Sequence, residues 1–187
     1  MNITMLAKKG GVGKTTLGLL LHEAFRNAGK SVAIRDWDAQ GTSSKALKTF
    51  GGTAAEVDQV YDVLLYDTPP NLEHTATSYA VQQADIIVVL TSPSPADLWE
   101  ADETARFASD KNPHAAIRLV FNRVRKGTRL ARLIPKSAED ISAPALEPYI
   151  SYRECYQAAL GRGWQALDGP AREEVLQVTV ALLSLGK

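Results

Sequence analysis

The sequence has one cysteine, Cys155, no net charge and no long apolar run. A single cysteine excludes an internal disulfide. Lysine plus arginine number 21 and aspartate plus glutamate also number 21, so the overall charge argues neither for nor against a nucleic-acid partner. No apolar stretch approaches the roughly 20 residues that span a bilayer, and no leader-like segment precedes the first apolar run. We therefore expect a cytoplasmic protein.

Histidine is also scarce. The three histidines are scattered without the spacing of metal ligands, so they predict no metal site of their own. The chain has 187 residues of ordinary composition and no internal repeat. These properties predict a single domain over residues 1–187, in which folding buries about 70% of the surface of the unfolded chain.

Apolar runs of strand length recur along the chain, and helical patterns lie between most of them. This alternation predicts an α/β fold with a mostly parallel, twisted sheet and helices on both of its faces. The predicted strands are residues 3–7, 31–36, 63–67, 86–91 and 117–122. The predicted helices are residues 14–28, 95–109, 128–138, 152–160 and 170–185. Residues 41–60 have weak periodicity, and an element could be missing there.

The first predicted strand leads into a glycine-rich run, KKGGVGKTT at residues 8–16. Its glycines allow successive backbone N–H groups to point inward, and the helix that begins near Gly13 adds the positive end of its dipole. Such a cradle suits a triphosphate. In the Walker pattern G-x-x-x-x-G-K-[ST], Lys14 reaches the β- and γ-phosphates and the Thr15 hydroxyl ligates Mg²⁺. The predicted nucleotide-binding residues are Gly10, Gly11, Val12, Gly13, Lys14, Thr15 and Thr16.

The run departs from the Walker pattern at its start, where Lys8 replaces the first glycine and Lys9 follows. KGGVGKTT with a leading lysine resembles the deviant Walker A box of the ParA/MinD family, and the likeness to its short ParA-type (ParF-like) plasmid partition ATPases covers nearly the whole chain. The resemblance implies a P-loop NTPase fold that uses ATP and Mg²⁺. It also implies that Lys9 crosses a homodimer interface to the partner's nucleotide and acts in catalysis with Lys14. The alternative is that Lys8 and Lys9 are a solvated basic pair.

Asp36 and Asp38 follow the second predicted strand in the run DWDAQ, which is similar to the family's D-x-D-x-Q motif. On an extended segment two residues separated by one point the same way, so both carboxylates can face the terminal phosphate and its metal. The resemblance implies that Asp36 helps to hold the hydrated Mg²⁺ and that Asp38, as a catalytic residue, positions or deprotonates the attacking water. The alternative is a pair of turn-forming aspartates at a strand end.

Asp67 closes the third predicted strand and begins the run DTPP, which resembles the family's Walker B segment. The resemblance implies that Asp67 binds Mg²⁺ through water, so Thr15, Asp36 and Asp67 are the predicted metal residues. Because Mg²⁺ keeps several waters, one hydroxyl and outer carboxylates are a sufficient protein contribution. The alternative is that Asp67 caps a helix that starts near Leu72, although the two prolines favour a rigid switch loop.

Asn122 closes the last predicted strand, at a place where the family often carries an asparagine that reads the adenine ring. A side-chain amide offers both a donor and an acceptor to the edge of the base. By the same resemblance, Pro148 lies on the backbone that meets the other side of the base. The alternative for Asn122 is a plain strand-end residue in a turn.

Between positions 118 and 136 the chain carries several basic residues and no acidic residue. This local bias suits DNA phosphates, and the lack of interleaved aromatics predicts binding that ignores base sequence and weakens with salt. The predicted DNA-binding residues are Arg123, Arg125, Lys126, Arg129 and Arg153. The alternative is a solvated basic face without a ligand.

Together these features resemble a ParA-type ATPase for plasmid or chromosome segregation. The resemblance implies ATP-dependent dimerisation, nonspecific binding to double-stranded DNA, slow basal hydrolysis, stimulation by a ParB-like or centromere-binding adaptor, and a nucleoid-associated location. The alternatives are a positioning ATPase for another cargo, such as an enzyme compartment or a chemoreceptor cluster, a nucleotide-binding scaffold without hydrolysis, and a MinD-like membrane ATPase.

The membrane alternative is disfavoured, and we expect no membrane partner. The last helical segment contains Glu173 and Glu174 where a membrane-binding helix would carry lysine or arginine, so its apolar residues predict core packing. Its apolar positions are Val175, Leu176, Val178, Leu182 and Leu183. An iron–sulfur relative of the nitrogenase iron protein kind is excluded, because it needs paired cysteines.

Overall fold

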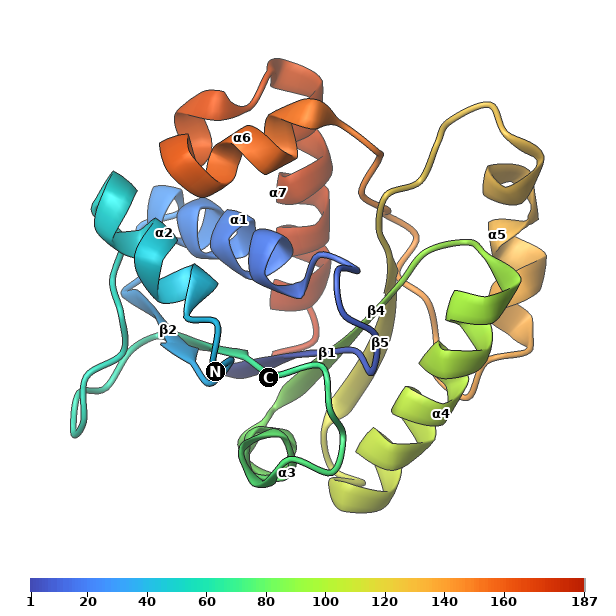
Figure 1. Cartoon of the computed structure of the whole chain (residues 1–187), viewed down its shortest axis with the longest axis horizontal. Helices are drawn as coiled ribbons and strands as arrows, with labels where there is room; N and C mark the ends of the chain where they lie inside the picture. The colour runs from blue at the N-terminus through green and yellow to red at the C-terminus, as the bar shows by residue number, and fades with distance from the viewer. Residues whose placement is uncertain (187) are drawn as a thin grey trace.

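The computed structural model describes residues 1–186 and contains a five-stranded parallel sheet in the order β2-β3-β1-β4-β5 (Figure 1). This confirms the predicted α/β architecture, and the sheet with its helices is that of a P-loop NTPase. The strands are β1 (Asn2–Leu6), β2 (Val32–Asp36), β3 (Val63–Asp67), β4 (Ile86–Thr91) and β5 (Ala116–Phe121). All five coincide with predicted strands to within one residue at either end.

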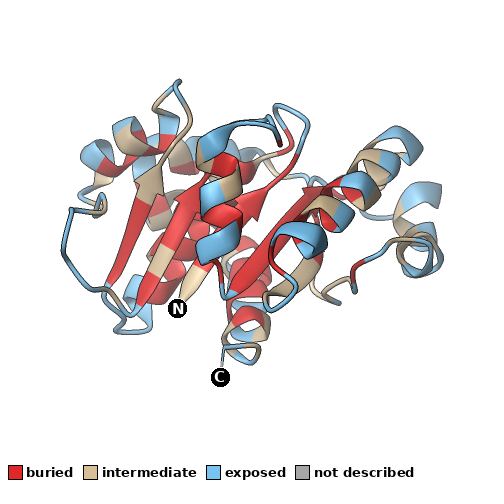
Figure 2. Ribbon diagram, turned by 90° about the horizontal axis from the view of Figure 1, so that it is seen from below, coloured by how far each residue is buried: buried red, intermediate tan, exposed pale blue. Residues whose placement is uncertain are grey.

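Helices cover both faces of the sheet (Figures 1 and 2). One face is covered by α1 (Lys14–Asn27), α2 (Thr42–Phe50), α6 (Glu154–Arg162), the short 3₁₀ helix η1 (Gly163–Ala166) and α7 (Gly169–Leu183). The other face is covered by α3 (Thr75–Gln83) and α4 (Pro95–Lys111). Because α1 leaves β1 toward one face and α4 leaves neighbouring β4 toward the other, a crevice forms at the carboxyl ends of these two strands, where open α/β sheets bind ligands.

The strands are buried between the two helical layers, as Figure 2 shows. In β4 every residue is buried. Ile86 and Val88 pack into the core beneath α1 and α7, whereas Ile87 and Val89 pack into the core beneath α4. This two-sided burial explains why the central strands are continuously apolar rather than alternating.

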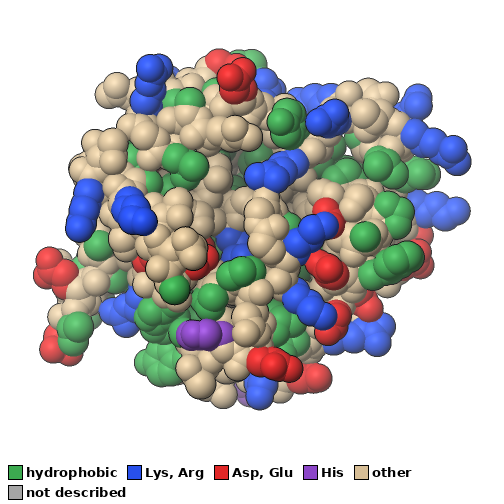
Figure 3. Space-filling view, in the orientation of Figure 1, with side chains coloured by type: hydrophobic (Ala, Val, Ile, Leu, Met, Phe, Trp, Pro, Cys, Tyr) green, Lys and Arg blue, Asp and Glu red, His purple; other side chains and the backbone are tan. Residues whose placement is uncertain are grey.

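The helix α5 (Arg129–Glu139) lies beside the β5 edge and has no fully buried residue. Ala131 and Ile134 are its partly buried contacts with the core on the α4 face. Lys and Arg side chains gather over this helix in the space-filling view (Figure 3). The basic segment seen in the sequence therefore forms one exposed edge of the molecule.

The structure shows two helices in segments that the sequence left open. Residues 41–60, which lacked a clear pattern, contain α2, whose ends are set by Gly41 and Gly51 in left-handed conformations with φ of 61° and 73°. The helix expected near Leu72 begins at Thr75, where the His74 side chain accepts a hydrogen bond from the Ala76 N–H at 3.2 Å. Both helices have nine residues, which is short for a pattern of period 3.6 to emerge.

The C-terminal helix α7 packs against α1, as predicted for a core helix. Val175, Val178 and Leu182 are completely buried, whereas Leu176 is 42% exposed, so its assignment to the core was wrong. Within residues 1–186, no helix combines the length and apolar character that crossing a membrane requires.

Candidate nucleotide-binding site

The glycine-rich run forms a loop between β1 and α1 at the carboxyl edge of the sheet. Gly11 and Gly13 have φ of 78° and 100°, a left-handed region that glycine adopts without strain. Gly13 is the residue before α1, and no side chain caps this helix end. The first backbone N–H groups of α1 are therefore available to an anion, and the dipole of the helix favours negative charge there.

We expect Gly13→Ala to abolish nucleotide binding. A Cβ atom at this position would lie 2.4 Å from Nδ2 of Asn122, and alanine is also strained at a φ of 100°. The loop or the end of β5 must then shift, which disrupts the cradle. Gly161→Ala is the control, because its Cβ meets no atom within 4 Å. Fluorescence titration with a labelled ATP analogue checks this, and comparable binding by both variants would contradict it.

Lys14 points into the site rather than into solvent. Its Nζ lies 3.4 Å from the Ala7 carbonyl oxygen, and the residue is buried. Burial lowers the pKa of Lys14, and this shift is opposed by the nearby carboxylates of Asp67 and Asp38. An ammonium group in this position is able to neutralise charge on phosphate oxygens without being screened by bulk water.

Thr15 and Asp67 meet at the start of α1. The Thr15 hydroxyl donates a hydrogen bond to Oδ2 of Asp67 at 2.8 Å, and Asp67 is only 2% exposed. The other carboxylate oxygen, Oδ1, is buried without a hydrogen-bond partner. Burial raises the pKa of Asp67 to about 6, although the Thr15 hydrogen bond opposes the shift. The charge of nearby Lys14 also opposes the shift. A buried carboxylate with one oxygen that lacks a hydrogen-bond partner, beside a hydroxyl, is a place that a cation would stabilise further.

These residues fit Mg²⁺ better than a metal that takes only protein ligands. Among residues 1–186, no group of three or more His, Cys, Asp or Glu side chains is arranged to hold a metal ion. Mg²⁺ does not need such a group, because it retains waters and shares phosphate oxygens with one or two protein ligands. Thr15 supplies a hydroxyl, and Asp67 supplies an orphaned oxygen for a water of the hydrated ion.

The structure brings Asp36 next to Asp67, since the two residues are paired in register across β2 and β3. Asp36 is fixed by two backbone N–H groups, from Asp38 at 3.1 Å and from Ser44 at 2.9 Å. Asp38 is partly buried and accepts a hydrogen bond from the Gln40 N–H at 3.0 Å. The two predicted acidic residues of the DWDAQ run and the Walker B aspartate thus lie at one edge of the sheet.

Lys9 extends away from this acidic cluster. Its Nζ pairs with Asp97 of α4 at 2.5 Å, and its side chain is 50% exposed. Hydrogen bonding to Asp97 raises the pKa of Lys9. Neighbouring Lys8 pairs with Glu103 on the same helix at 2.9 Å and is 46% exposed. The run therefore presents one lysine inward, at position 14, and two outward, at positions 8 and 9.

Asn122 secures the base-side end of the loop. Its Nδ2 donates to the Val12 carbonyl oxygen at 2.8 Å, and its Oδ1 accepts from the Arg123 N–H at 2.8 Å. Arg123 itself has a left-handed φ of 56°, which is uncommon for arginine. Asn122 is therefore a clamp between β5 and the phosphate loop, a role that its position in the sequence did not predict.

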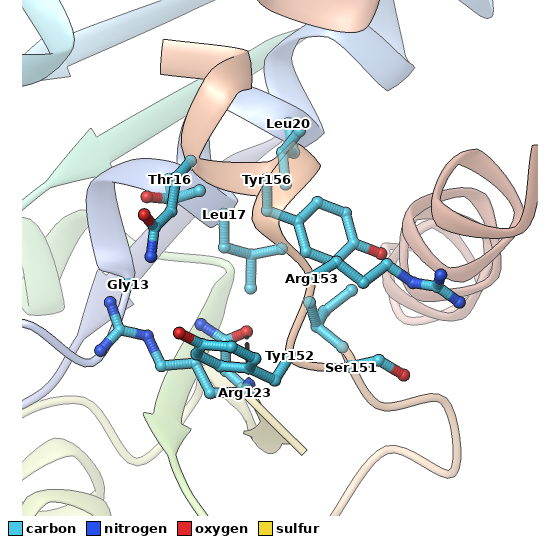
Figure 4. A pocket seen from close by; sticks show the side chains of 12 residues that line it. Gly13, Thr16, Leu17, Leu20, Arg123, Ser151, Tyr152, Arg153 and Tyr156 are labelled. Carbon is cyan, nitrogen blue, oxygen red and sulfur yellow. Dashed lines mark hydrogen bonds between the residues drawn. The ribbon is translucent and has the colours of Figure 1, made fainter. Parts of the chain in front are cut away.

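A cavity lies next to this clamp (Figure 4). Beside Gly13 and Asn122, its walls come from α1 and from the segment after β5 that leads into α6. The lining residues are Gly13, Thr16, Leu17, Leu20, Asn122, Arg123, Ile150, Ser151, Tyr152, Arg153, Tyr156 and Gln157. Its position beside the phosphate loop makes it the candidate pocket for a nucleotide base.

The predicted base contact Pro148 is not among these lining residues. It instead borders a shallow hollow along α7, together with Leu176 and Val180. The wall is formed two to eight residues further along the chain, from Ile150 to Tyr156. No motif marks these residues, so sequence reasoning missed them.

The predicted DNA-binding residues do not form one free surface. Arg123, Arg125, Lys126 and Arg129 are exposed, but Arg153 is bound to Glu174 at 2.9 Å and its side chain is 24% exposed. Arg123 also lines the base cavity. Lys126 is bound to the same carboxylate at 2.9 Å, but its side chain is 57% exposed. The structure therefore argues against Arg153 as a DNA contact, because its guanidinium is both engaged by Glu174 and mostly covered.

Known proteins share both the sequence pattern and the fold. The sequence model of the CobQ/CobB/MinD/ParA nucleotide binding domain matches residues 3–165. The Maintenance of carboxysome distribution protein A of Halothiobacillus neapolitanus is 27% identical over 186 residues, covering 88% of this chain and 85% of that protein. A plasmid partition protein of Borrelia burgdorferi bound to AMPPNP has a TM-score of 0.78 at 15% identity, with 98% of both chains covered. The MinC:MinD cell division complex of Aquifex aeolicus gives a TM-score of 0.76 at 16% identity, with 97% and 95% covered. At these identities the two solved structures show the fold alone.

Proposed function

This chain belongs to the CobQ/CobB/MinD/ParA nucleotide-binding family, and from that premise we propose that it is a ParA-type ATPase that positions a cargo on DNA. ATP binding closes two copies face to face, and the closed dimer holds double-stranded DNA without reading its sequence. Slow hydrolysis, accelerated by an adaptor of the ParB-like or centromere-binding class, releases the DNA. The adaptor connects the cycle to the cargo.

The observation that supports this proposal most is the opposite placement of Lys14 and Lys9. Lys14 is buried near Asp67 and Asp38, whereas Lys9 is half exposed and is paired with Asp97 on a different helix. An ordinary phosphate loop needs only the inward lysine. If Lys9 exchanges its ion pair with Asp97 for a phosphate held by another copy, it acts in the way an arginine finger does.

The residues at the carboxyl edge of the sheet supply the chemistry of hydrolysis. When bound, Mg²⁺ would neutralise charge on the phosphate oxygens, with Thr15 and Asp67 holding it and Asp36 supporting its waters. Asp38 has one carboxylate oxygen that binds the Gln40 N–H, which leaves the other to orient or deprotonate an attacking water. Lys14 and the N-terminus of α1 stabilise the charge on the transferred phosphoryl group.

The basic edge around α5 supports the DNA-binding step. Arg125, Lys126 and Arg129 are exposed on the loop and helix that follow β5. No acidic residue interrupts positions 118 to 136. Such an edge contacts phosphates rather than bases, so affinity falls steeply with salt.

Two cargoes have support. The relative that covers 88% of this chain is named for carboxysome distribution, which favours an enzyme compartment. A solved structure with the same fold comes from a plasmid partition protein, which is consistent with plasmid DNA. Imaging after deletion of the gene separates them, because a positioning ATPase for compartments leaves plasmid inheritance intact and a partition ATPase does not.

The DNA-binding step is tested by retention of the protein on immobilised nonspecific DNA with ATP, with ADP and without nucleotide. We expect retention only with ATP and Mg²⁺, and an increase when Asp38→Ala blocks hydrolysis. Equal retention in all three conditions contradicts the proposed ATP-dependent cycle.

Reversing the charge of single arginines tests which surface binds DNA. We expect Arg129→Glu to weaken DNA retention at least about tenfold and to reduce the slope of log affinity against log salt by about 1. The control is Arg106→Glu on α4, where the arginine is also exposed but pairs with Asp102 at 2.9 Å, outside the basic edge. Equal effects of the two variants would place DNA elsewhere.

A further inference from the structure

One buried carboxylate of α7 lies outside the phosphate and metal site yet is surrounded by donors. Glu174 is only 8% exposed, although it lies on a helix whose other inward residues are mostly apolar. Its Oε1 accepts hydrogen bonds from Ser151 Oγ at 2.8 Å, Arg153 Nη2 at 2.9 Å and Lys126 Nζ at 2.9 Å. Its Oε2 accepts from Tyr156 OH at 2.8 Å, the Ser151 N–H at 3.0 Å and Arg153 Nε at 3.4 Å.

Most of these donors belong to one wall of the base cavity. Ser151, Arg153 and Tyr156 all line it, together with Gly13 and Asn122. In Figure 4 the Tyr156 hydroxyl and the Arg153 guanidinium both point away from the cavity toward a neighbouring helix, while the Tyr156 ring faces inward. The Arg153 guanidinium and the Tyr156 hydroxyl are thus bound to α7 through Glu174, and the apolar parts of these side chains face the cavity.

Glu174 holds the wall strongly because its carboxylate is ionised and both of its oxygens accept hydrogen bonds. Burial alone would raise the pKa of Glu174, but the hydrogen bonds from Arg153, Lys126 and Ser151 lower this pKa to about 2. Charge-assisted hydrogen bonds of this kind are stronger than neutral ones, and a network fixes geometry more firmly than a single pair does. The wall lies in a loop and the first turn of α6. Backbone hydrogen bonds join Ile150 and Tyr152 to the segment that ends β5, around the bridge between Val124 and Ser151. The side chains of Ser151, Arg153 and Tyr156 are held in addition by Glu174.

We propose that Glu174 is a positioning residue for nucleotide binding, which holds the segment from Ser151 to Tyr156 in the conformation that accepts the base. This inference rests on the proposed function, since it requires that the cavity take the base of ATP. The hydrogen-bond partners of Glu174 are Lys126, Ser151, Arg153 and Tyr156, none of which belongs to the phosphate loop or to the predicted metal residues. Removal of Glu174 therefore affects the part of the affinity that the base contributes and leaves the triphosphate part in place.

Calorimetric titration of the full chain with Mg²⁺-ATP and with Mg²⁺-tripolyphosphate tests the proposal. We expect Glu174→Gln to weaken ATP binding at least about tenfold, because an amide offers only one acceptor oxygen to these donors. Binding of tripolyphosphate, which has no base, stays unchanged. The matched control is Glu173→Gln on the exposed side of the same helix, which alters neither affinity.

Tyr156→Phe provides a second, milder test that keeps the ring in the cavity and removes one donor to Glu174. We expect a loss of about two- to fivefold for ATP and none for tripolyphosphate, with little change in melting temperature. This variant decides the matter if Glu174→Gln does not fold.

The outcomes separate the two hypotheses. If wild-type protein does not bind ATP, the proposed function fails and the inference fails with it. If wild-type protein binds ATP and a folded Glu174→Gln variant binds it equally well, the inference alone is overturned. Parallel loss of ATP and tripolyphosphate binding also overturns it, since that pattern indicates general damage to the phosphate loop.

Discussion

Replacing Lys9 with alanine is expected to leave ATP binding nearly unchanged while reducing ATP hydrolysis by about 100-fold or more and preventing ATP-dependent dimerisation. The size of the effect follows from the value of a cationic group supplied in trans to the transferred phosphoryl group, which is about 10³ to 10⁵ in related chemistry. ATP binding survives because Lys14, the glycines and the N-terminus of α1 belong to the same subunit as the nucleotide.

The pairing of Lys9 with Asp97 does not prevent this role. Asp97 is held by the Ser92 hydroxyl, while the Lys9 side chain is half exposed. Only the lysine side of this ion pair is exposed, since the Asp97 side chain is 12% exposed. A triphosphate carries several negative charges and therefore competes with the single carboxylate for the lysine. The pair keeps Lys9 near the mouth of the site in a single subunit without committing it there.

Lys8→Ala is the matched control, because Lys8 has nearly the same exposure and pairs with a glutamate of the same helix. Phosphate release and sedimentation of both variants, each with saturating Mg²⁺-ATP, distinguish a specific role from a general loss of positive charge. Sedimentation is repeated in the Asp38→Ala background, so that ATP is not hydrolysed and the dimer does not dissociate during the measurement. A Lys9→Ala protein that dimerises and turns over normally contradicts the proposed mechanism.

Local patterns predicted the arrangement of residues at the carboxyl edge of the sheet well. The glycine-rich run and the continuously apolar strands each depend on neighbouring residues, and the structure places them as expected. The register of β2 and β3 then brings Asp36 and Asp67 together without any further signal from the sequence. Parallel strands that end in polar residues necessarily collect those residues at one edge.

The base-side wall could not be predicted in the same way. Its geometry depends on contacts between segments that are far apart in the chain, such as those of Ser151 and Lys126 with Glu174. A glutamate in an amphipathic helix ordinarily faces water, and only the folded structure shows that this one is buried. For the same reason the sequence suggested that Arg153 is a free basic residue, whereas in the structure it forms an ion pair with Glu174.

Asp67→Asn is expected to stabilise the ligand-free protein at neutral pH while abolishing its response to Mg²⁺. The pKa of Asp67 is raised from 3.8 to about 6 in the folded state, so the folded protein binds the proton more tightly than the unfolded chain. Stability from this group is therefore present below pH 4 and is lost as the pH rises to about 6. At about 1.4 kcal/mol per pH unit, the ionised carboxylate costs the free protein up to about 3 kcal/mol.

Asparagine removes that charge but leaves a polar group in the same place, so we expect a gain in the free energy of unfolding of about 1–2 kcal/mol at pH 7.5 that disappears near pH 4. The control is Asp62→Asn, since Asp62 accepts hydrogen bonds from the Ser31 N–H and hydroxyl, both at 2.8 Å, which lower its pKa. That variant is expected to lose stability at pH 7.5, with the opposite sign.

Denaturant unfolding at the two pH values, with and without Mg²⁺-ATP, measures both effects. Wild-type protein regains the lost stability when Mg²⁺-ATP binds, because the cation compensates the orphaned oxygen of Asp67. The Asp67→Asn protein gains much less from Mg²⁺ at the same nucleotide concentration. A variant that is less stable than wild type at pH 7.5, or one that responds fully to Mg²⁺, would show that this carboxylate is a structural group satisfied within the fold rather than one held in readiness for a metal ion.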